Sequence, residues 1–460
     1  MICRLLMAAF VVVAGVAVRA GETLNRDALT KALDAALDSH PTARRTTVTL
    51  KVIDLESGDV LYDRGGDRLL TPASNLKIYT AACALDAFGP EHRFSTTVRA
   101  TGVIRDGVLH GNLTLVGGGD SMFSHKDLAR LAERVVDEWG LKRIAGRVVV
   151  DKSRYASRLK GPGWMWDDEP EYFNMSVTPM MVDFNVLKVR LSRGEDGVIA
   201  ELVPPAAYPA IEQVAGEGGD APAKVTREPF SDELKLVDGV LRKPKEQRVT
   251  MHDPGRWVAA MMTRMLADRG MKFVQAEDEP RLDAPEVREI VLRGKTLTET
   301  LKHFHDVSEN AVGEVLLHEI AIERGVKRPD WPAGAKVISE WLVAKAGLEK
   351  GSFRLVDGSG LSRYNLISAD SSVRHLKYLY DSEHFNVFFA SLPAEKVDGK
   401  PVVSAKGGSM SGVSTISGYI RTDDGRLLAF SLLANGFLGD NKPVFDLRQC
   451  VWRALVRFRP

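Results

Sequence analysis

A serine and a lysine three residues apart form the first pair in this sequence whose types and spacing suit chemistry. Ser74 and Lys77 lie in the stretch TPASNLKIYTAA, at the expected start of an apolar helix. Residues three apart face the same side of a helix, and a lysine whose pKa is lowered by burial or by a second cation activates a neighbouring serine. The same pair also suits a helix cap and a solvated side chain, so by itself it leaves both interpretations open.

A second candidate lies in the stretch DVSENAVGEV, which contains Ser308 and Asn310. In one interpretation the serine hydroxyl relays a proton to a leaving group, and the asparagine amide holds a substrate carbonyl. In the other the segment is an ordinary helix start, with Asp306 as the cap and Glu309 reaching back to it. The two interpretations are compatible.

A third candidate is the stretch SAKGGSMSG, in which Lys406 precedes Gly407, Gly408 and Ser409. One interpretation is a glycine-rich turn with an exposed lysine. The other is an edge strand that glycines leave bare, so that a peptide substrate lies against its backbone beside a positive charge.

The three segments occur in the order Ser-x-x-Lys, Ser-x-Asn and Lys-x-Gly, which is the motif order of penicillin-binding proteins and serine β-lactamases. Over nearly all of its length after the first 20 residues, the sequence resembles the D-alanyl-D-alanine carboxypeptidase/endopeptidase family. These are the class C low-molecular-mass penicillin-binding proteins, the group of penicillin-binding protein 4. Four further stretches carry this resemblance: LVGGGDSMFS (115–124), GPGWMWDDEPEYF (161–173), VDGSGLSRYNLIS (356–368) and SGYIRTDDGRLLAFSLLAN (417–435).

The resemblance implies an α/β (α+β) fold, in which a serine transpeptidase/β-lactamase-like domain with a helix-flanked sheet is interrupted by a long β-rich insertion. It implies cleavage of peptidoglycan stem peptides, covalent inhibition by β-lactams and no cofactor. The backbone N–H groups of the nucleophile and of Ser409 would form the oxyanion hole. The implied catalytic residues are Ser74 as nucleophile, Lys77 as base and Ser308, and the implied substrate-binding residues are Asn310, Lys406, Gly408 and Ser409.

One position departs from the family pattern, because Gly407 stands where a threonine is usual. That hydroxyl normally helps to bind the terminal carboxylate of the substrate. Losing one hydrogen bond to a charged group costs about 1.5–3 kcal/mol, or roughly 10- to 150-fold in binding. Two alternatives therefore stay open: a non-catalytic peptidoglycan-binding relative, and a β-lactamase or esterase on the same scaffold.

The hydrophobic pattern indicates which elements hold these residues. Residues 21–90 predict the first part of the transpeptidase-like domain, and residues 291–460 predict the second part. Between them, the short β-rich runs of 91–290 predict an inserted module, with a nested subdomain near 190–250. The expected helices are 25–40, the helix after Pro72, 125–140, 309–325, 333–348 and 444–458, and the clearest expected strands are 46–57 and the hairpin 414–435.

The first residues predict export. An arginine near the start, an apolar run to Val18 and a short residue at Ala20 indicate a signal peptide cleaved after Ala20. The run is short for a membrane span, so we expect a secreted or periplasmic mature chain without an integral span. The net charge of +1 offers no global attraction to nucleic acid. His303 and His305 lack a third ligand in the sequence, so we expect no metal site.

Overall fold

The computed structural model describes residues 23–216, 218–274 and 286–460. The predicted signal peptide, residues 1–20, lies outside these residues.

One six-stranded antiparallel sheet joins the two ends of the chain. Its strand order is β17-β18-β19-β20-β1-β2. Strand β1 pairs with β20 from Thr47 opposite Asn435 to Asp54 opposite Leu428. The bounds are β1 (Thr47–Asp54), β2 (Val60–Arg64), β17 (Ala394–Val397), β18 (Lys400–Met410), β19 (Val413–Arg421) and β20 (Leu427–Asn435). Two segments more than 300 residues apart in the sequence therefore form one sheet.

The terminal helices α1 (Arg26–Ser39) and α10 (Lys442–Val456) pack against each other over this sheet. Apolar residues recur along α10 at helical spacing, and Leu447, Val451 and Trp452 are buried in the same core as Phe430 of β20. This confirms the expected terminal helix packed on a sheet.

The opposite side of the sheet carries a cluster of helices. Helix α2 is buried on nearly all sides from Lys77 to Leu85, as expected for a helix that is apolar all round. A short 3₁₀ turn, η1 (Ala73–Leu76), leads into it. The bounds are α2 (Lys77–Phe88), α5 (Leu297–Asp306), α6 (Asn310–Glu323), α7 (Trp331–Ala344), α8 (Ala369–Tyr380) and α9 (Phe385–Ser391), and two short strands, β15 (Phe353–Arg354) and β16 (Leu366–Ile367), form a further pair.

The middle of the chain forms a second six-stranded sheet. Its path is β13-β5-β4-β3-β14, with β6 also paired to β4. Helix α3 packs on β14, helix α4 packs on β6, and the two helices contact each other. The bounds are β3 (Arg93–Arg105), β4 (Val108–Gly118), β5 (Arg143–Ala145), β6 (Val148–Asp151), β13 (Lys272–Val274), β14 (Glu286–Thr296), α3 (His125–Trp139) and α4 (Pro254–Ala267).

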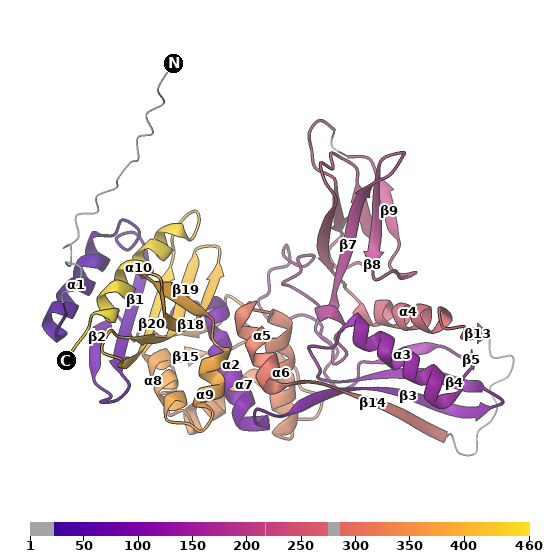
Figure 1. The fold of residues 1–460 in the computed structure, drawn as a ribbon, viewed down its shortest axis with the longest axis horizontal. Coiled ribbons are helices and arrows are strands. Elements are labelled where there is room, and N and C mark those ends of the chain that lie inside the picture. Colours follow the sequence, from indigo (N-terminus) through magenta and orange to yellow (C-terminus); the bar gives the residue numbers. More distant parts are fainter. Residues whose placement is uncertain (1–22, 217, 275–285) are drawn as a thin grey trace.

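Two three-stranded sheets stand beside this second sheet (Figure 1). Their orders are β12-β7-β8 and β10-β11-β9. A 3₁₀ turn, η2 (Asp183–Asn185), enters the first of them. The bounds are β7 (Val186–Arg193), β8 (Val198–Val203), β9 (Ile211–Val214), β10 (Lys224–Arg227), β11 (Leu234–Val237) and β12 (Lys245–Thr250).

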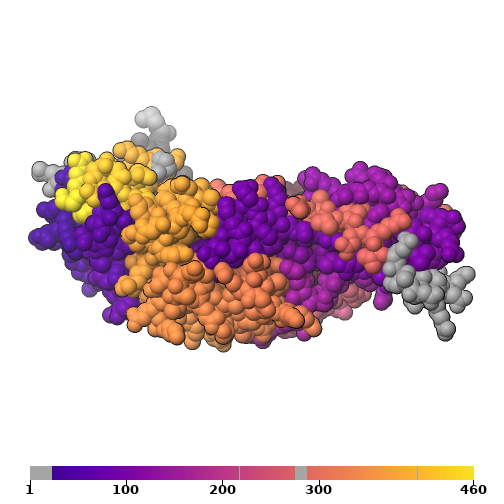
Figure 2. All heavy atoms as spheres, turned by 90° about the horizontal axis from the view of Figure 1, so that it is seen from below, coloured from indigo at the N-terminus to yellow at the C-terminus, as the bar shows by residue number. Residues whose placement is uncertain are grey.

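The molecule is elongated, with helices α1 and α10 in one half and the middle of the chain in the other (Figures 1 and 2). A mixed α/β fold with helices beside a sheet confirms the expected fold class. The domain boundaries 21–90, 91–290 and 291–460, and the nested subdomain near 190–250, stay predictions.

Candidate active site

Ser74 lies on the 3₁₀ turn rather than on the α-helix, which begins only at Lys77. A 3₁₀ turn has three residues per turn, so Lys77 lies directly beside Ser74, with its Nζ 2.8 Å from the serine Oγ. The preceding Ala73 has a φ of 48°, a strained conformation of the kind found at functional sites. A Cβ on Gly360 would lie 1.9 Å from the carbonyl oxygen of Ala73, so a glycine is required where this loop packs on the turn.

Lys77 is fully buried, which rules out the solvated side chain considered from the sequence. Its Nζ donates to Ser74 Oγ at 2.8 Å, to Asn310 Oδ1 at 2.7 Å and to the carbonyl of Ser359 at 2.8 Å. Burial and the charge of Lys406 lower its pKa well below the ordinary lysine value, and the nearby carboxylates only partly oppose this. A lysine in this setting has a neutral form available as a base.

Ser308 and Lys406 form a second pair. Ser308 lies between α5 and α6 with a φ of 60°, and its Oγ accepts a hydrogen bond from Lys406 Nζ at 3.0 Å. Lys406 is only 4% exposed, and burial lowers its pKa to about 8. The interpretation of Lys406 as an exposed lysine on a glycine-rich turn is therefore wrong. The expected cap at Asp306 is also wrong, because Asp306 ends α5 and Glu309 caps α6.

Asn310 connects the nucleophile region to the segment 161–173. Its Oδ1 accepts the hydrogen bond from Lys77, and its Nδ2 donates to the carbonyl oxygen of Phe173 at 2.9 Å. This segment, one of the four stretches that carry the family resemblance, is thereby held against the cleft.

The third motif lies on β18, next to the turn that carries Ser74. Strand β17 pairs with β18 only as far as Ser404, so among the described residues the strand continues beyond Lys406 with β19 on one side alone. A Cβ on Gly408 would lie 2.4 Å from the carbonyl oxygen of Pro72, so only glycine allows this approach. The side chain of Ser409 is exposed, and its Oγ accepts a hydrogen bond from Asn441 Nδ2.

Gly407 differs from Gly408 in its surroundings. A Cβ at Gly407 would meet only the carbonyl oxygen of Thr415, at 3.7 Å. The missing threonine is therefore not explained by lack of space.

Two buried carboxyl groups, Glu314 and Asp357, hold the loop that contacts Lys77. Neither was predicted from the sequence. Glu314 on α6 accepts hydrogen bonds from the backbone of Gly358 at 3.2 Å and of Ser359 at 2.9 Å. Asp357 accepts from the backbone of Gly360 at 2.8 Å. Burial, followed by the charge of Asp357, raises the pKa of Glu314, whereas the hydrogen bonds from Ser359, Trp331 and Gly358 oppose this rise. The pair holds the loop whose carbonyl at Ser359 contacts Lys77, and the only sequence signal for it was an acidic residue inside an apolar helix.

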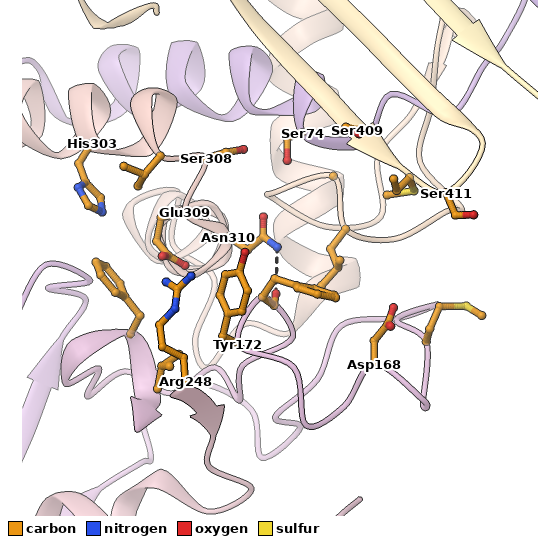
Figure 3. A pocket seen from close by; sticks show the side chains of 18 of the residues that line it. Ser74, Asp168, Tyr172, Arg248, His303, Ser308, Glu309, Asn310, Ser409 and Ser411 are labelled. Carbon is orange, nitrogen blue, oxygen red and sulfur yellow. Dashed lines mark hydrogen bonds between the residues drawn. The ribbon is translucent and has the colours of Figure 1, made fainter. Parts of the chain in front are cut away.

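These residues border a cleft of about 760 Å³. Ser74, Ser308, Asn310 and Ser409 line it, whereas Lys77, Lys406 and Gly408 lie buried behind its wall. Ser74 lies between Ser308 on one side and Ser409 on the other (Figure 3). Beyond them, residues from the middle of the chain line the two ends of the cleft, among them Asp168 of the stretch 161–173 and Arg248, which no motif had indicated.

The two histidines of the sequence HFH are separated. His305 is buried with Nδ1 2.9 Å from Ser391 Oγ, and burial lowers its pKa to about 3. His303 lines the cleft and stacks on Phe184. Within the described ranges, no group of three or more His, Cys, Asp or Glu side chains is arranged to hold a metal ion, and no helix combines the length and the apolar character that a membrane crossing requires.

A serine hydrogen-bonded to a buried lysine in an open cleft, on a mixed α/β fold, defines a serine hydrolase of the acyl-transfer type. Residues 29–451 match the model of the D-Ala-D-Ala carboxypeptidase 3 (S13) family, and the chain belongs to this family. The resemblance inferred from the motifs is thereby confirmed.

Individual relatives agree with this assignment. A D-alanyl-D-alanine carboxypeptidase of an Actinomadura species (strain R39) is 30% identical over 440 residues, covering 88% of this chain and 81% of the relative. The D-alanyl-D-alanine carboxypeptidase DacB of Haemophilus influenzae is 26% identical, covering 84% of each chain. The crystal structure of penicillin binding protein 4 from H. influenzae has the same fold, with a TM-score of 0.76, 23% identity, and coverage of 92% of this chain and 98% of that one.

Proposed function

We propose that this hydrolase cleaves the terminal D-alanyl-D-alanine bond of peptidoglycan stem peptides, with Ser74 as the nucleophile and Lys77 as its base. The observation that carries the proposal is the 2.8 Å contact between Lys77 Nζ and Ser74 Oγ in a fully buried setting.

Acylation begins with neutral Lys77. The hydroxyl proton of Ser74 moves to the Lys77 amine while Ser74 Oγ forms a bond to the carbonyl carbon of the penultimate D-alanine. The backbone N–H groups of Ser74 and Ser409 stabilise the oxyanion that develops. Asn310 orients Lys77, since its Oδ1 accepts a hydrogen bond from Lys77 while its Nδ2 is held by the carbonyl oxygen of Phe173.

The leaving amine receives its proton on the Ser308 side of the cleft. Ser308 Oγ is hydrogen-bonded to Lys406 Nζ and not to Lys77, so Ser308 passes a proton from Lys406 to the amine as the C–N bond breaks. Water then attacks the acyl carbon and gives its proton through Ser308 to neutral Lys406. As the bond to Ser74 Oγ breaks, Lys77 returns its proton to Ser74, so the shortened peptide is released and all three side chains regain their starting states.

The substrate's terminal carboxylate binds near Lys406 and the hydroxyl of Ser409. Both groups lie on β18, and Gly408 keeps the strand close to the nucleophile turn. Because Gly407 adds no hydroxyl, we expect weaker carboxylate binding than a threonine would give.

The same site binds β-lactams covalently, because their strained amide presents a carbonyl and a carboxylate in the place of the peptide. The proposal includes export to the periplasm or the cell exterior, on the basis of residues 1–20. It requires no cofactor.

A fluorescent penicillin tests the proposal. The mature chain is incubated with it, and its intact mass is followed with time. We expect a stable adduct on the wild-type chain and none on Ser74→Ala. Rapid turnover of the penicillin would identify a β-lactamase, and a folded wild-type chain that is never acylated would refute the enzymatic role of Ser74.

A further inference from the structure

The cleft continues past Ser308, away from the strand that carries Ser409. Figure 3 shows His303, Glu309 and Arg248 on this side of Ser74, and Asp168 and Ser411 on the other. We call the Ser308 side the distal arm. It is lined by Phe184, Val186, Lys188, Arg248, His303 and Glu309.

Two cations of the distal arm lie directly opposite each other. Arg248 on β12 pairs in register with Lys188 on β7, and both side chains are exposed. Like charges in this arrangement destabilise a sheet. Within the described ranges neither side chain has a carboxylate within the 4.0 Å of an ion pair. Arg248 and Lys188 therefore present positive charge to the cleft that is not paired with a carboxylate of the described part of the chain.

The two nearby carboxyl groups are held by other partners and form no ion pair with these cations. Asp183 is engaged by His125, with 2.7 Å between carboxylate oxygen and Nδ1. Glu309 faces the arm in Figure 3 but caps α6 by accepting from Ala311 N at 3.3 Å. Burial raises the pKa of Glu309 despite the opposing positive charges of Lys77, His303 and Arg248.

The arm is also preorganised. The guanidinium carbon of Arg248 lies 3.8 Å from the ring centroid of Tyr172, an arrangement that fixes the planar cation. Asp183, Phe184 and Asn185 all have positive φ, between 46° and 61°. Strain of this kind persists where a ligand surface must be held in place. Phe184 stacks on His303 and gives the distal arm an apolar wall.

We propose that the distal arm binds the leaving portion of a cross-linked substrate, and that Arg248 and Lys188 hold a carboxylate of that second peptide. The proposal rests on the proposed function, because Ser308 marks the side on which the amine departs. When the leaving group is a single D-alanine, it departs from beside Lys406 and Ser409 and has no further group that reaches the arm. In a cross-linked substrate the leaving amine belongs to a second stem peptide. The aliphatic chain of that peptide contacts the apolar wall, and its carboxylates bind the two cations.

Binding to Ser74→Ala tests the arm without catalysis. The probe is a labelled cross-linked muropeptide dimer, compared with the same dimer whose leaving-strand carboxylates are amidated. We expect Lys188→Gln/Arg248→Gln to weaken binding of the free dimer about tenfold and to leave binding of the amidated dimer unchanged. Lys243→Gln removes one exposed cation of the same module outside the cleft and is the control, for which we expect no change. If the double substitution weakens binding of both dimers equally, or leaves binding of both unchanged, the proposal is overturned.

Turnover by the chain with intact Ser74 gives a second measurement. We expect the double substitution to lower kcat/KM for dimer cleavage about tenfold more than for release of D-alanine from a monomeric pentapeptide. Equal losses on the two substrates would place the cations on the acyl side and overturn the proposal. A wild-type chain that cleaves neither substrate would refute the proposed function, while the binding comparison would still decide whether the arm exists.

Discussion

The carboxyl group of Glu314 accepts a hydrogen bond from the backbone N–H of Ser359 at 2.9 Å, and the carbonyl of the same Ser359 accepts one from Lys77 at 2.8 Å. A buried acid on α6 is thus linked to Lys77, the neighbour of the nucleophile, through the backbone of a single residue, Ser359. Glu314 is a positioning residue in this arrangement, because it contacts the loop and not the cleft.

Glu314→Gln tests this role. Glutamine turns an N–H₂ group toward donors that now face carboxylate oxygens, among them Trp331 Nε1 at 2.7 Å, so we expect about 1–3 kcal/mol lower stability. Three N–H groups donate to Glu314 and favour its ionised form. The charge of that form raises the pKa of Lys77, so its removal lowers that pKa further. We therefore expect the acid limb of penicillin acylation to move to lower pH, which stopped-flow rates between pH 5 and about 9 measure.

The exposed Glu323 on the same helix supplies the control for Glu314. Glu323→Gln is expected to leave both the melting temperature and the acid limb in place. A Glu314→Gln variant that loses stability with an unmoved acid limb would reduce Glu314 to a structural residue.

The acylation rate of the wild-type chain is expected to have a bell-shaped pH profile. It rises as Lys77 loses its proton, because the neutral amine is the base. It falls as Lys406 loses its proton, since its pKa is about 8 and the neutral form no longer attracts the carboxylate. In Lys406→Gln the cation that lowers the Lys77 pKa is gone, so we expect the acid limb to move to higher pH. A profile that rises steadily through pH 10 would contradict the assignment of Lys406.

Gly407→Thr is expected to improve substrate binding. A Cβ at this position has only the Thr415 carbonyl near it, at 3.7 Å, and the added hydroxyl supplies a hydrogen bond to the carboxylate. We expect roughly 10- to 150-fold lower KM for a carboxylate-bearing substrate, measured as D-alanine release. An unchanged KM would show that the carboxylate does not bind beside residue 407.

Gly408→Ala is expected to have the opposite effect. Its Cβ would lie 2.4 Å from Pro72 O and 2.6 Å from Asn75 N, so β18 and the nucleophile turn must separate. We expect slower acylation together with about 1–3 kcal/mol lower stability, measured by denaturant unfolding. Wild-type acylation in this variant would mean that the turn and the strand move independently.

Asn441→Ala tests how the Ser409 hydroxyl is oriented. Asn441 Nδ2 donates to Ser409 Oγ, so the serine keeps its own hydrogen for the substrate carboxylate. We expect about 2- to 12-fold higher KM with kcat nearly unchanged. Lys442→Gln, a neighbouring exposed substitution, should leave KM alone, and a fall in kcat without a change in KM would contradict this role of Asn441.

The amino-acid sequence by itself determined the family, and it predicted seven candidate site residues that the structure brings together. This was achievable because Ser74 and Lys77 are local neighbours and the other motifs carry recognisable residue types in a fixed order. The helices at 26–39, 125–139 and 442–456 were also predicted to within two residues at either end, since their apolar spacing is regular.

Only the tertiary structure decided which charged and polar groups lie next to each other. Lys406 reaches Ser308 across 98 positions of sequence, and Glu314 reaches Ser359 only because both are buried beside α2. Arg248 and Lys188 become neighbours through the register of β12 and β7. Local patterns record which face of an element is apolar, whereas pKa values and cleft walls depend on burial and on contacts between distant segments, which no short stretch of sequence contains.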